Sequence, residues 1–422
     1  MMRYYFVFTC IIFVLQTMNA QFVANYDESQ VPEFDLPDPL TTFSNKHILT
    51  STSWNELRRP ELINFFESQV FGKVPGTLDA IAFEVEEESN SALGGLAKRR
   101  QVKVTITKNS RSLSFLILLY LPIKIGRAPL FLGYNFHGNH TVINDPDIII
   151  SKAWSLNNKS IGITNHTLTE ESRGLRSSRW AITKMIEAGY GLATIYYGEI
   201  DPDKNDLTDG LHSLFYTEGQ IRPAKDEWGS IGAWAWALSR AMDYVENDME
   251  VDKTRVIVFG HSRLGKAALW AGAMDERFAG VISNDSGCGG AALSKRKFGE
   301  TVAQINENFP YWFSANYKKY NNAEEKLPAD QHELLALIAP RPLYVASAQE
   351  DQWADPKGEF LSAHYATPVY SLFGEAGISS NEMPGVNSPI QNTVAYHIRT
   401  GKHDVTEYDW EQYIKWATEQ FD

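Results

Sequence analysis

A serine at the tip of a predicted strand, turn and helix is the residue of this chain best placed for nucleophilic chemistry. The apolar run 256–259 ends in Gly260, the chain turns through Ser262, and a small, apolar, helix-forming segment follows. A serine in such a turn is exposed at the end of a sheet, and the N–H groups of the new helix point toward an anion formed beside it. This arrangement suits attack on an acyl carbon by a serine that a base activates. The alternative is that Ser262 only caps the helix.

The turn departs from the common pattern Gly-x-Ser-x-Gly at one position. Leu264 stands where the second glycine is expected, and Gly265 follows one residue later. We therefore expect the turn to accommodate a side chain that the commoner pattern avoids.

A serine nucleophile in this setting needs an acid and a histidine that follow it in the chain in that order. His403 fits, because it lies between the last predicted strand and the last predicted helix. We expect it to accept the proton of Ser262 and later to protonate the leaving alcohol; the alternative is an exposed loop histidine. Asp351, after a strong apolar strand, and Asp285, after the strand that follows Ser262, both qualify as the acid. Asp285 could instead form a turn, and Asp351 could start a helix or join a salt bridge. We predict that they share this task, with Asp351 the larger contributor.

Apolar runs alternate with helical patterns along most of the chain and predict the elements that hold these residues. Strands are expected at 81–86, 101–107, 113–122, 129–136, 191–197, 256–260, 278–283, 341–348 and 394–398, and helices at 56–71, 179–188, 230–246, directly after Ser262, and 407–421. Because the central strands are almost continuously apolar, the pattern predicts a mostly parallel sheet with helices on both faces, which is a three-layer α/β fold.

Polar insertions interrupt this alternation at about 143–175 and 205–228, and we expect the second to shape a rim. The loop His137–His140, after an early strand, could supply oxyanion donors or could be a plain turn. The sequence shows no internal repeat or clear linker, so we predict that residues 21–422 form a single catalytic domain.

The net charge, the first residues and the cysteine content indicate the partners and the cellular compartment. A net charge of −13 excludes nucleic acid as a partner, since no basic surplus exists to neutralise phosphates. Residues 1–20 carry one arginine, an apolar run and a small-residue site near Ala20, which predicts a secretory signal peptide; a short membrane anchor is the alternative. Its removal leaves Cys288 as the single cysteine, so we expect a secreted or periplasmic enzyme without an internal disulfide. No spacing of metal ligands appears, and we expect neither a metal nor another cofactor.

Several blocks together resemble the glucuronoyl esterases of carbohydrate esterase family 15, bacterial type. Gly260–Lys266 matches the family pattern Gly-x-Ser-Arg-x-Gly-Lys, which accounts for the displaced glycine. Further blocks resemble the family at 58–61, 284–290, 297–300, 350–360 and 401–403. The resemblance covers most of the chain after residue 20 and implies the α/β-hydrolase fold.

The resemblance also implies a reaction and roles for further residues. The reaction is hydrolysis of the ester between 4-O-methyl-glucuronic acid on xylan and a lignin alcohol. The Arg263 guanidinium would join the oxyanion site, and Lys266, one helical turn after the serine, would contact a sugar hydroxyl. Glu300 and Trp353 match other contacts to the sugar; their alternatives are a surface salt bridge and a core indole. Family members place the acid at the position of Asp285, of Asp351 or at both, so the resemblance does not decide between them.

The expected partner is therefore a glucuronoxylan or lignin–carbohydrate ester, and we expect a monomer. An acetyl-xylan esterase or a peptidase on the same scaffold is an alternative, but an acetyl group offers no hydroxyls for Lys266, Glu300 and Trp353 to bind. A non-catalytic carbohydrate-binding protein is a second alternative. It would have no use for a serine, acid and histidine in catalytic order.

Overall fold

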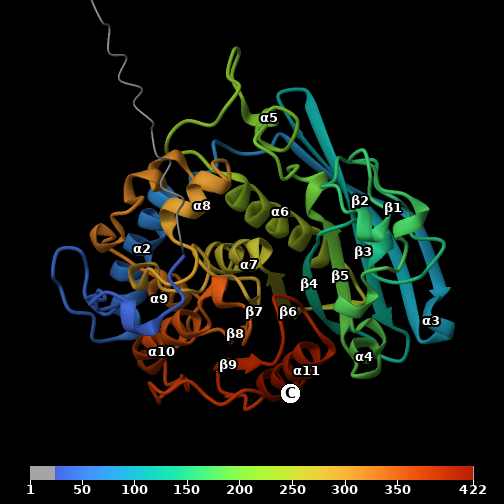
Figure 1. Cartoon of the computed structure of the whole chain (residues 1–422). Coiled ribbons are helices and arrows are strands. Elements are labelled where there is room, and N and C mark those ends of the chain that lie inside the picture. Colours follow the sequence, from blue (N-terminus) through green and yellow to red (C-terminus); the bar gives the residue numbers. More distant parts are fainter. Residues whose placement is uncertain (1–23, 422) are drawn as a thin grey trace, which may run out of the picture.

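A nine-stranded sheet forms the centre of the computed structural model, which describes residues 24–421; the predicted signal peptide lies outside the described residues (Figure 1). The strand order is β1-β2-β3-β5-β4-β6-β7-β8-β9. The strands are β1 (Ala80–Ser91), β2 (Ala97–Lys108), β3 (Arg111–Pro122), β4 (Ala128–Asn135), β5 (Gly191–Tyr196), β6 (Val251–His261), β7 (Gly280–Asn284), β8 (Leu343–Ala348) and β9 (Val394–Arg399).

The sheet is mostly parallel, as predicted. The strands from β5 to β9 in spatial order run parallel to their neighbours. In contrast, β1, β2 and β3 form an antiparallel ribbon, and β3 joins β5 in antiparallel orientation. A two-residue turn, Asn109-Ser110, links β2 to β3 with positive φ at both residues, which is the geometry that closes tight hairpins.

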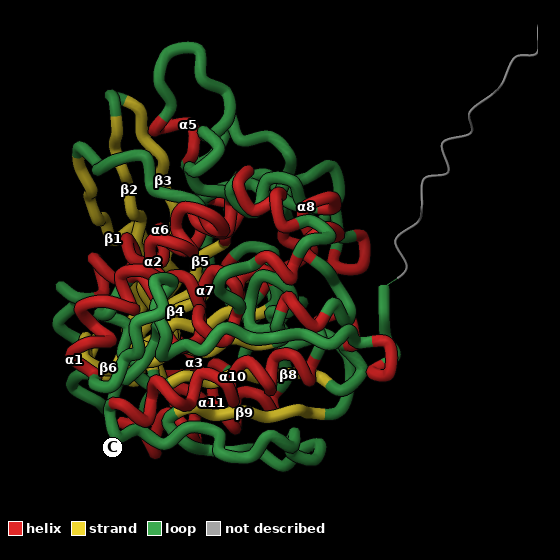
Figure 2. The backbone as a smooth tube through the Cα atoms, turned by 90° about the vertical axis from the view of Figure 1, so that its left-hand side faces the viewer, coloured by secondary structure: helices red, strands yellow, loops and turns green. Residues whose placement is uncertain are grey.

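Alternate residues of the central strands face two separate hydrophobic clusters. In β6, Val256 and Val258 belong to one cluster and Ile257 and Phe259 to the other, because successive side chains of a strand point to opposite faces. The first face is covered by α2 (Arg59–Phe66), α6 (Ser230–Val245), α7 (Arg263–Met274), α9 (Gln331–Ala336) and α10 (Pro356–Leu372), and the second by α4 (Ile182–Glu187) and α11 (Glu407–Phe421) (Figures 1 and 2). The predicted three-layer α/β architecture is confirmed.

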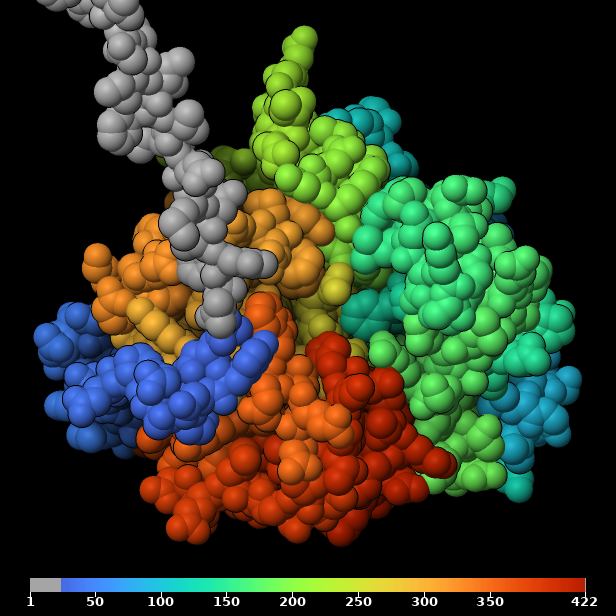
Figure 3. All heavy atoms as spheres, viewed as in Figure 1, coloured from blue at the N-terminus to red at the C-terminus, as the bar shows by residue number. Residues whose placement is uncertain are grey.

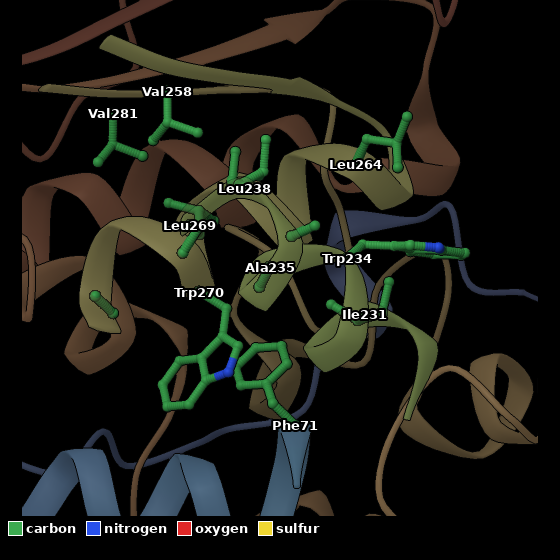
Figure 4. Packing of buried hydrophobic residues seen from close by; sticks show 14 of the residues in the cluster. Phe71, Ile231, Trp234, Ala235, Leu238, Val258, Leu264, Leu269, Trp270 and Val281 are labelled. Atoms are coloured by element: carbon green, nitrogen blue, oxygen red, sulfur yellow. The ribbon is translucent and has the colours of Figure 1, made fainter. Parts of the chain in front are cut away.

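The packing of α7 fixes the start of this helix against the sheet (Figure 4). Trp270 stacks on Phe71 with ring centroids 4.7 Å apart. Leu264 and Leu269 are fully buried in the same cluster as Val258 of β6. Each such side chain contributes about 1.5–3 kcal/mol by leaving water, so this packing holds the start of α7 against the first face of the sheet.

The first predicted helix, 56–71, is confirmed and begins earlier than expected, at Ser51. It runs through α1 (Ser51–Ser53), a π-helical turn at Trp54–Arg58, α2 and a second π-helical turn at Glu67–Phe71. Among residues 24–421, no helix combines the length and the apolar character that a membrane crossing requires.

Candidate active site

The predicted strand, turn and helix around Ser262 is confirmed. Strand β6 ends at His261 and α7 begins at Arg263, so Ser262 is the single residue between them. Its φ of 58° and ψ of −131° lie in a region that residues with side chains rarely occupy. A Cβ atom at Gly260 would lie 2.0 Å from the carbonyl oxygen of Leu264, so glycine is required there. Ser262 lies in this tight turn and lines a cavity there.

The displaced second glycine also has a structural reason. The Leu264 side chain is fully buried in the core beneath the turn. A Cβ atom at Gly265 would lie 2.9 Å from the Cβ of Ser286, on the loop that follows β7. The close approach that demands a glycine therefore falls one residue later than in the common pattern.

Both candidate acids lie beside the same imidazole. His403 Nδ1 is 2.5 Å from Asp351 Oδ2. Asp285, Asp351 and His403 each place a nitrogen or carboxylate oxygen within 4.8 Å of the others. Within the described residues, the imidazole hydrogen-bonds to Asp351 and not to Asp285. Among the described residues, these three side chains also place their ligand atoms close enough together to hold a metal ion.

The surroundings of Asp285 reduce its negative charge. Burial raises the pKa of Asp285 well above its usual value, and the charges of Glu359 and Asp351 raise it further. The Arg399 guanidinium, whose Nη2 lies 3.4 Å from Asp285 Oδ2, acts in the opposite direction. Asp351 is therefore the better placed of the two acids to stabilise a positive imidazole.

A second histidine supports the ring of His403. The rings of His261 and His403 have centroids 4.4 Å apart. His261 Nδ1 lies 2.6 Å from Asn284 Oδ1. Burial, and then repulsion by His403, lower the pKa of His261 well below its usual value. A neutral His261 packs against His403 without adding a competing positive charge.

Asp203 holds the Arg263 side chain beside the turn. This buried carboxylate accepts hydrogen bonds from the Arg263 guanidinium, from Tyr197 Oη at 3.0 Å, from Tyr311 Oη at 2.7 Å and from Trp312 Nε1 at 2.8 Å. The Trp312 ring also lies under the guanidinium, with its centroid 4.8 Å from Arg263 Cζ. Three donors besides Arg263 fix the Asp203 carboxylate, and this carboxylate and the Trp312 ring hold the guanidinium in one position.

A single cavity of about 350 Å³ gathers every candidate site residue predicted from the sequence. It opens in the recess that Figure 3 shows between the orange, red and green segments. The lining residues are Ser262, Arg263, Lys266, Asp285, Ser286, Gly287, Glu300, Phe309, Trp312, Asp351, Trp353, Ala354 and His403.

Lys266, Glu300 and Trp353 give the cavity a polar and aromatic wall. Lys266 Nζ donates to the carbonyl oxygen of Ser286, and burial lowers the pKa of this lysine. Burial raises the pKa of Glu300 to about 7, although Lys266 and Arg263 act in the opposite direction. Trp353 is 39% exposed, so the alternative of a core indole is wrong. These groups can offer hydrogen bonds and an aromatic face to a polar ligand.

Comparisons with known proteins show which family this chain resembles. A family model described as fungal glucuronyl esterase matches residues 181–374. Carbohydrate esterase MZ0003, from an unknown prokaryotic organism, is 49% identical over 394 residues, which cover 93% of this chain and 91% of that protein. A solved esterase of carbohydrate esterase family 15 from a marine bacterial metagenome is 48% identical with a TM-score of 0.89, over 94% of this chain and 100% of that one. This chain belongs to carbohydrate esterase family 15.

A further solved structure, the glucuronoyl esterase from Solibacter usitatus, is 47% identical with a TM-score of 0.88 over 93% of this chain and 100% of that chain. As a member of family 15, the chain is an enzyme, a carboxylic ester hydrolase with the α/β-hydrolase fold. The resemblance inferred from the sequence is therefore confirmed.

The sequence did not identify two residues that shape this family 15 site. Asp203 belongs to an acidic loop that directly follows β5, and its position after a buried strand was the available signal. His261 precedes the serine directly, but nothing in the sequence pairs its ring with that of His403.

Proposed function

We propose that this family 15 enzyme hydrolyses esters of glucuronic acid and its 4-O-methyl derivative, with Ser262 as the nucleophile of an acyl-enzyme mechanism. The observation that carries this proposal is the single cavity that combines Ser262 and the His403–Asp351 pair with polar groups suited to sugar hydroxyls. The Solibacter usitatus relative, a glucuronoyl esterase, supports the same substrate class.

In the proposed reaction, His403 takes the proton of Ser262 Oγ as this oxygen attacks the ester carbonyl. Asp351 keeps the imidazole in the required tautomer and stabilises its positive form. The backbone N–H and the guanidinium of Arg263 stabilise the oxyanion of the tetrahedral intermediate. His403 then protonates the leaving alcohol, activates a water molecule against the acyl-enzyme, and returns the proton to Ser262.

Recognition of the acyl sugar is assigned to Lys266, Glu300 and Trp353. All three lie on the cavity wall, and none is needed for the proton transfers. The natural ester is proposed to be the cross-link between 4-O-methyl-glucuronic acid on xylan and a lignin alcohol. We further infer that residues 21–422 act as one catalytic domain of a secreted or periplasmic monomer.

The test compares turnover of benzyl glucuronate with that of a simple aryl acetate. The Ser262→Ala variant should lose at least about 10⁴ in kcat on the glucuronate ester, whereas Ser160→Ala, at an exposed serine, should not. Substantial residual turnover in a folded Ser262→Ala enzyme would exclude this nucleophile. Turnover of the acetate alone by the wild type would instead favour an acetyl esterase, and binding without turnover a carbohydrate-binding protein.

A further inference from the structure

Two arginines and a histidine converge beside the active site but outside its cavity. Arg176 and Arg179 precede α4, and His137 follows β4. His137 lies near Arg263, because the Phe136 ring is 5.7 Å from Arg263 Cζ and 6.3 Å, centroid to centroid, from the His137 ring. The charges of Arg176, Arg179 and Arg263 all act on the His137 imidazole. None of His137, Arg176 and Arg179 lines the cavity that contains the nucleophile. This concentration of positive charge stands out in a chain whose net charge is −13.

The surrounding backbone holds these like charges together. Gly174 N donates to His140 O, and Arg176 N donates to Thr141 O, each at 2.9 Å. These bonds tie the end of the 143–175 insertion to the loop after β4. The positive groups are therefore positioned by the fold, against their mutual repulsion.

The charges of this cluster are incompletely paired. Arg263 is paired with Asp203, and Arg179 Nε lies 2.5 Å from Asp404 Oδ1. Arg176, however, has no ion pair within residues 24–421. Its Nε is a buried atom without a hydrogen-bond partner, and so is His137 Nδ1. Buried polar atoms of this kind are rare in folded proteins unless a ligand or water completes them.

We propose that His137, Arg176 and Arg179 bind an anionic group, a carboxylate or a sulfate, on the alcohol that the enzyme releases. A guanidinium presents paired N–H donors that match the oxygens of such groups. A neutral His137, whose pKa is lowered to about 3 by burial and by the arginines, can add a further hydrogen bond.

The proposed function, on which this inference rests, indicates which part of the substrate the cluster contacts. His403 protonates the leaving alcohol, and the next residue, Asp404, pairs with Arg179. The cluster therefore lies on the alcohol side of the reacting ester. The wall with Lys266 and Glu300 serves the sugar and contains none of the three cluster residues.

The test measures kcat/KM for three glucuronate esters: benzyl, 4-carboxybenzyl and 4-sulfooxybenzyl. At constant ionic strength, the wild type should prefer at least one anionic ester over the benzyl ester by about tenfold or more, as expected for a charge-assisted contact. The preferred anion distinguishes a carboxylate from a sulfate. Arg176→Gln should bring the ratio close to one. Arg222→Gln, which makes the same change at an exposed arginine of the other insertion, should keep the wild-type ratio.

A wild-type ratio near one, or a ratio that Arg176→Gln leaves unchanged, would overturn the proposal. Inorganic sulfate provides a measurement that needs no variant: compared with chloride, it should inhibit hydrolysis of the preferred anionic ester competitively, and no inhibition would count against the site. If no glucuronate ester is hydrolysed, the proposed function fails. Competitive inhibition by sulfate of the hydrolysis of an aryl acetate whose alcohol carries a carboxylate then tests the anion site separately.

Discussion

Replacement of the two acids beside His403 tests how the imidazole is stabilised. Asp351 makes the direct hydrogen bond at 2.5 Å, whereas Asp285 lies within 4.8 Å as a carboxyl whose pKa is raised. We expect Asp351→Asn to be the more damaging single change. We also expect the surviving carboxylate to rescue each single variant in part, because both lie close to the same ring.

The magnitudes follow from the geometry. Loss of a sole triad carboxylate costs about 10⁴ in kcat. A charge about 4 Å from the imidazolium is worth about 4 kcal/mol at an effective dielectric constant of 20, and the raised pKa of Asp285 reduces this contribution at neutral pH. We therefore expect losses of about 10² for Asp351→Asn and up to about tenfold for Asp285→Asn. The double variant should lose about 10⁴, which corresponds to a coupling of about 1.4 kcal/mol.

The assay is kcat for benzyl glucuronate in the wild type, both single variants and the double variant, with folding checked by circular dichroism. Asp404→Asn, at the neighbour of His403 whose carboxylate pairs with Arg179, is a control for an altered loop charge. If one single variant is inactive and the other behaves as wild type, sharing is wrong, and the inactive variant identifies the acid. Effects that simply multiply would also refute the rescue.

Three further predictions concern the sugar wall and the buried acids. Lys266→Ala should lower kcat/KM on glucuronate esters by about 10–100-fold, which corresponds to the loss of one or two hydrogen bonds. The same change should lower kcat/KM on an aryl acetate far less. Equal losses on both substrates would show that the lysine only supports the fold. Because the pKa of Glu300 is raised to about 7, KM for benzyl glucuronate should change as the pH passes about 7, and Glu300→Gln should remove that change; an unaltered inflection would belong to another group. Burial raises the pKa of Glu359 to about 8 from 4.5, so its contribution to stability is complete below pH 4.5 and is lost as the pH rises toward 8. In urea unfolding between pH 5.5 and 7.5, the wild type should lose up to about 1.4 kcal/mol per pH unit more than Glu359→Gln; parallel curves would contradict this.

Local patterns in the sequence predicted the helices and strands whose pattern of apolar residues is regular along the whole element. The terminal helix Glu407–Phe421 has the predicted bounds, and β6 and β8 lie where nearly continuous apolar runs place them. The helix α10 (Pro356–Leu372) was not predicted. Pro368 lies inside it, and an internal proline normally indicates a break. Tertiary packing on the sheet stabilises this helix against its local preference.

The residues proposed to react were predictable because chain order and strand ends place them at one edge of a parallel sheet. The residues that support them depend on contacts between distant segments. Asp203 reaches Arg263 across 60 residues, and Trp312 lies on a different segment from both. No periodicity or spacing encodes such a contact, so only the folded structure shows that Arg263 has a fixed partner.

Because its second glycine lies one residue later, the turn at Ser262 does not match the common sequence pattern Gly-x-Ser-x-Gly. A search for Gly-x-Ser-x-Gly does not find this chain. Glycine at position 264 would restore the match, but it would remove a fully buried leucine side chain and lower the free energy of unfolding by about 2–5 kcal/mol or more. A side chain at Gly265 would meet Ser286 at 2.9 Å. To change this turn into the common one, residues 264 and 265 and the loop that carries Ser286 would thus have to change together. A protein with only one of these changes would be less stable than a protein with either complete turn.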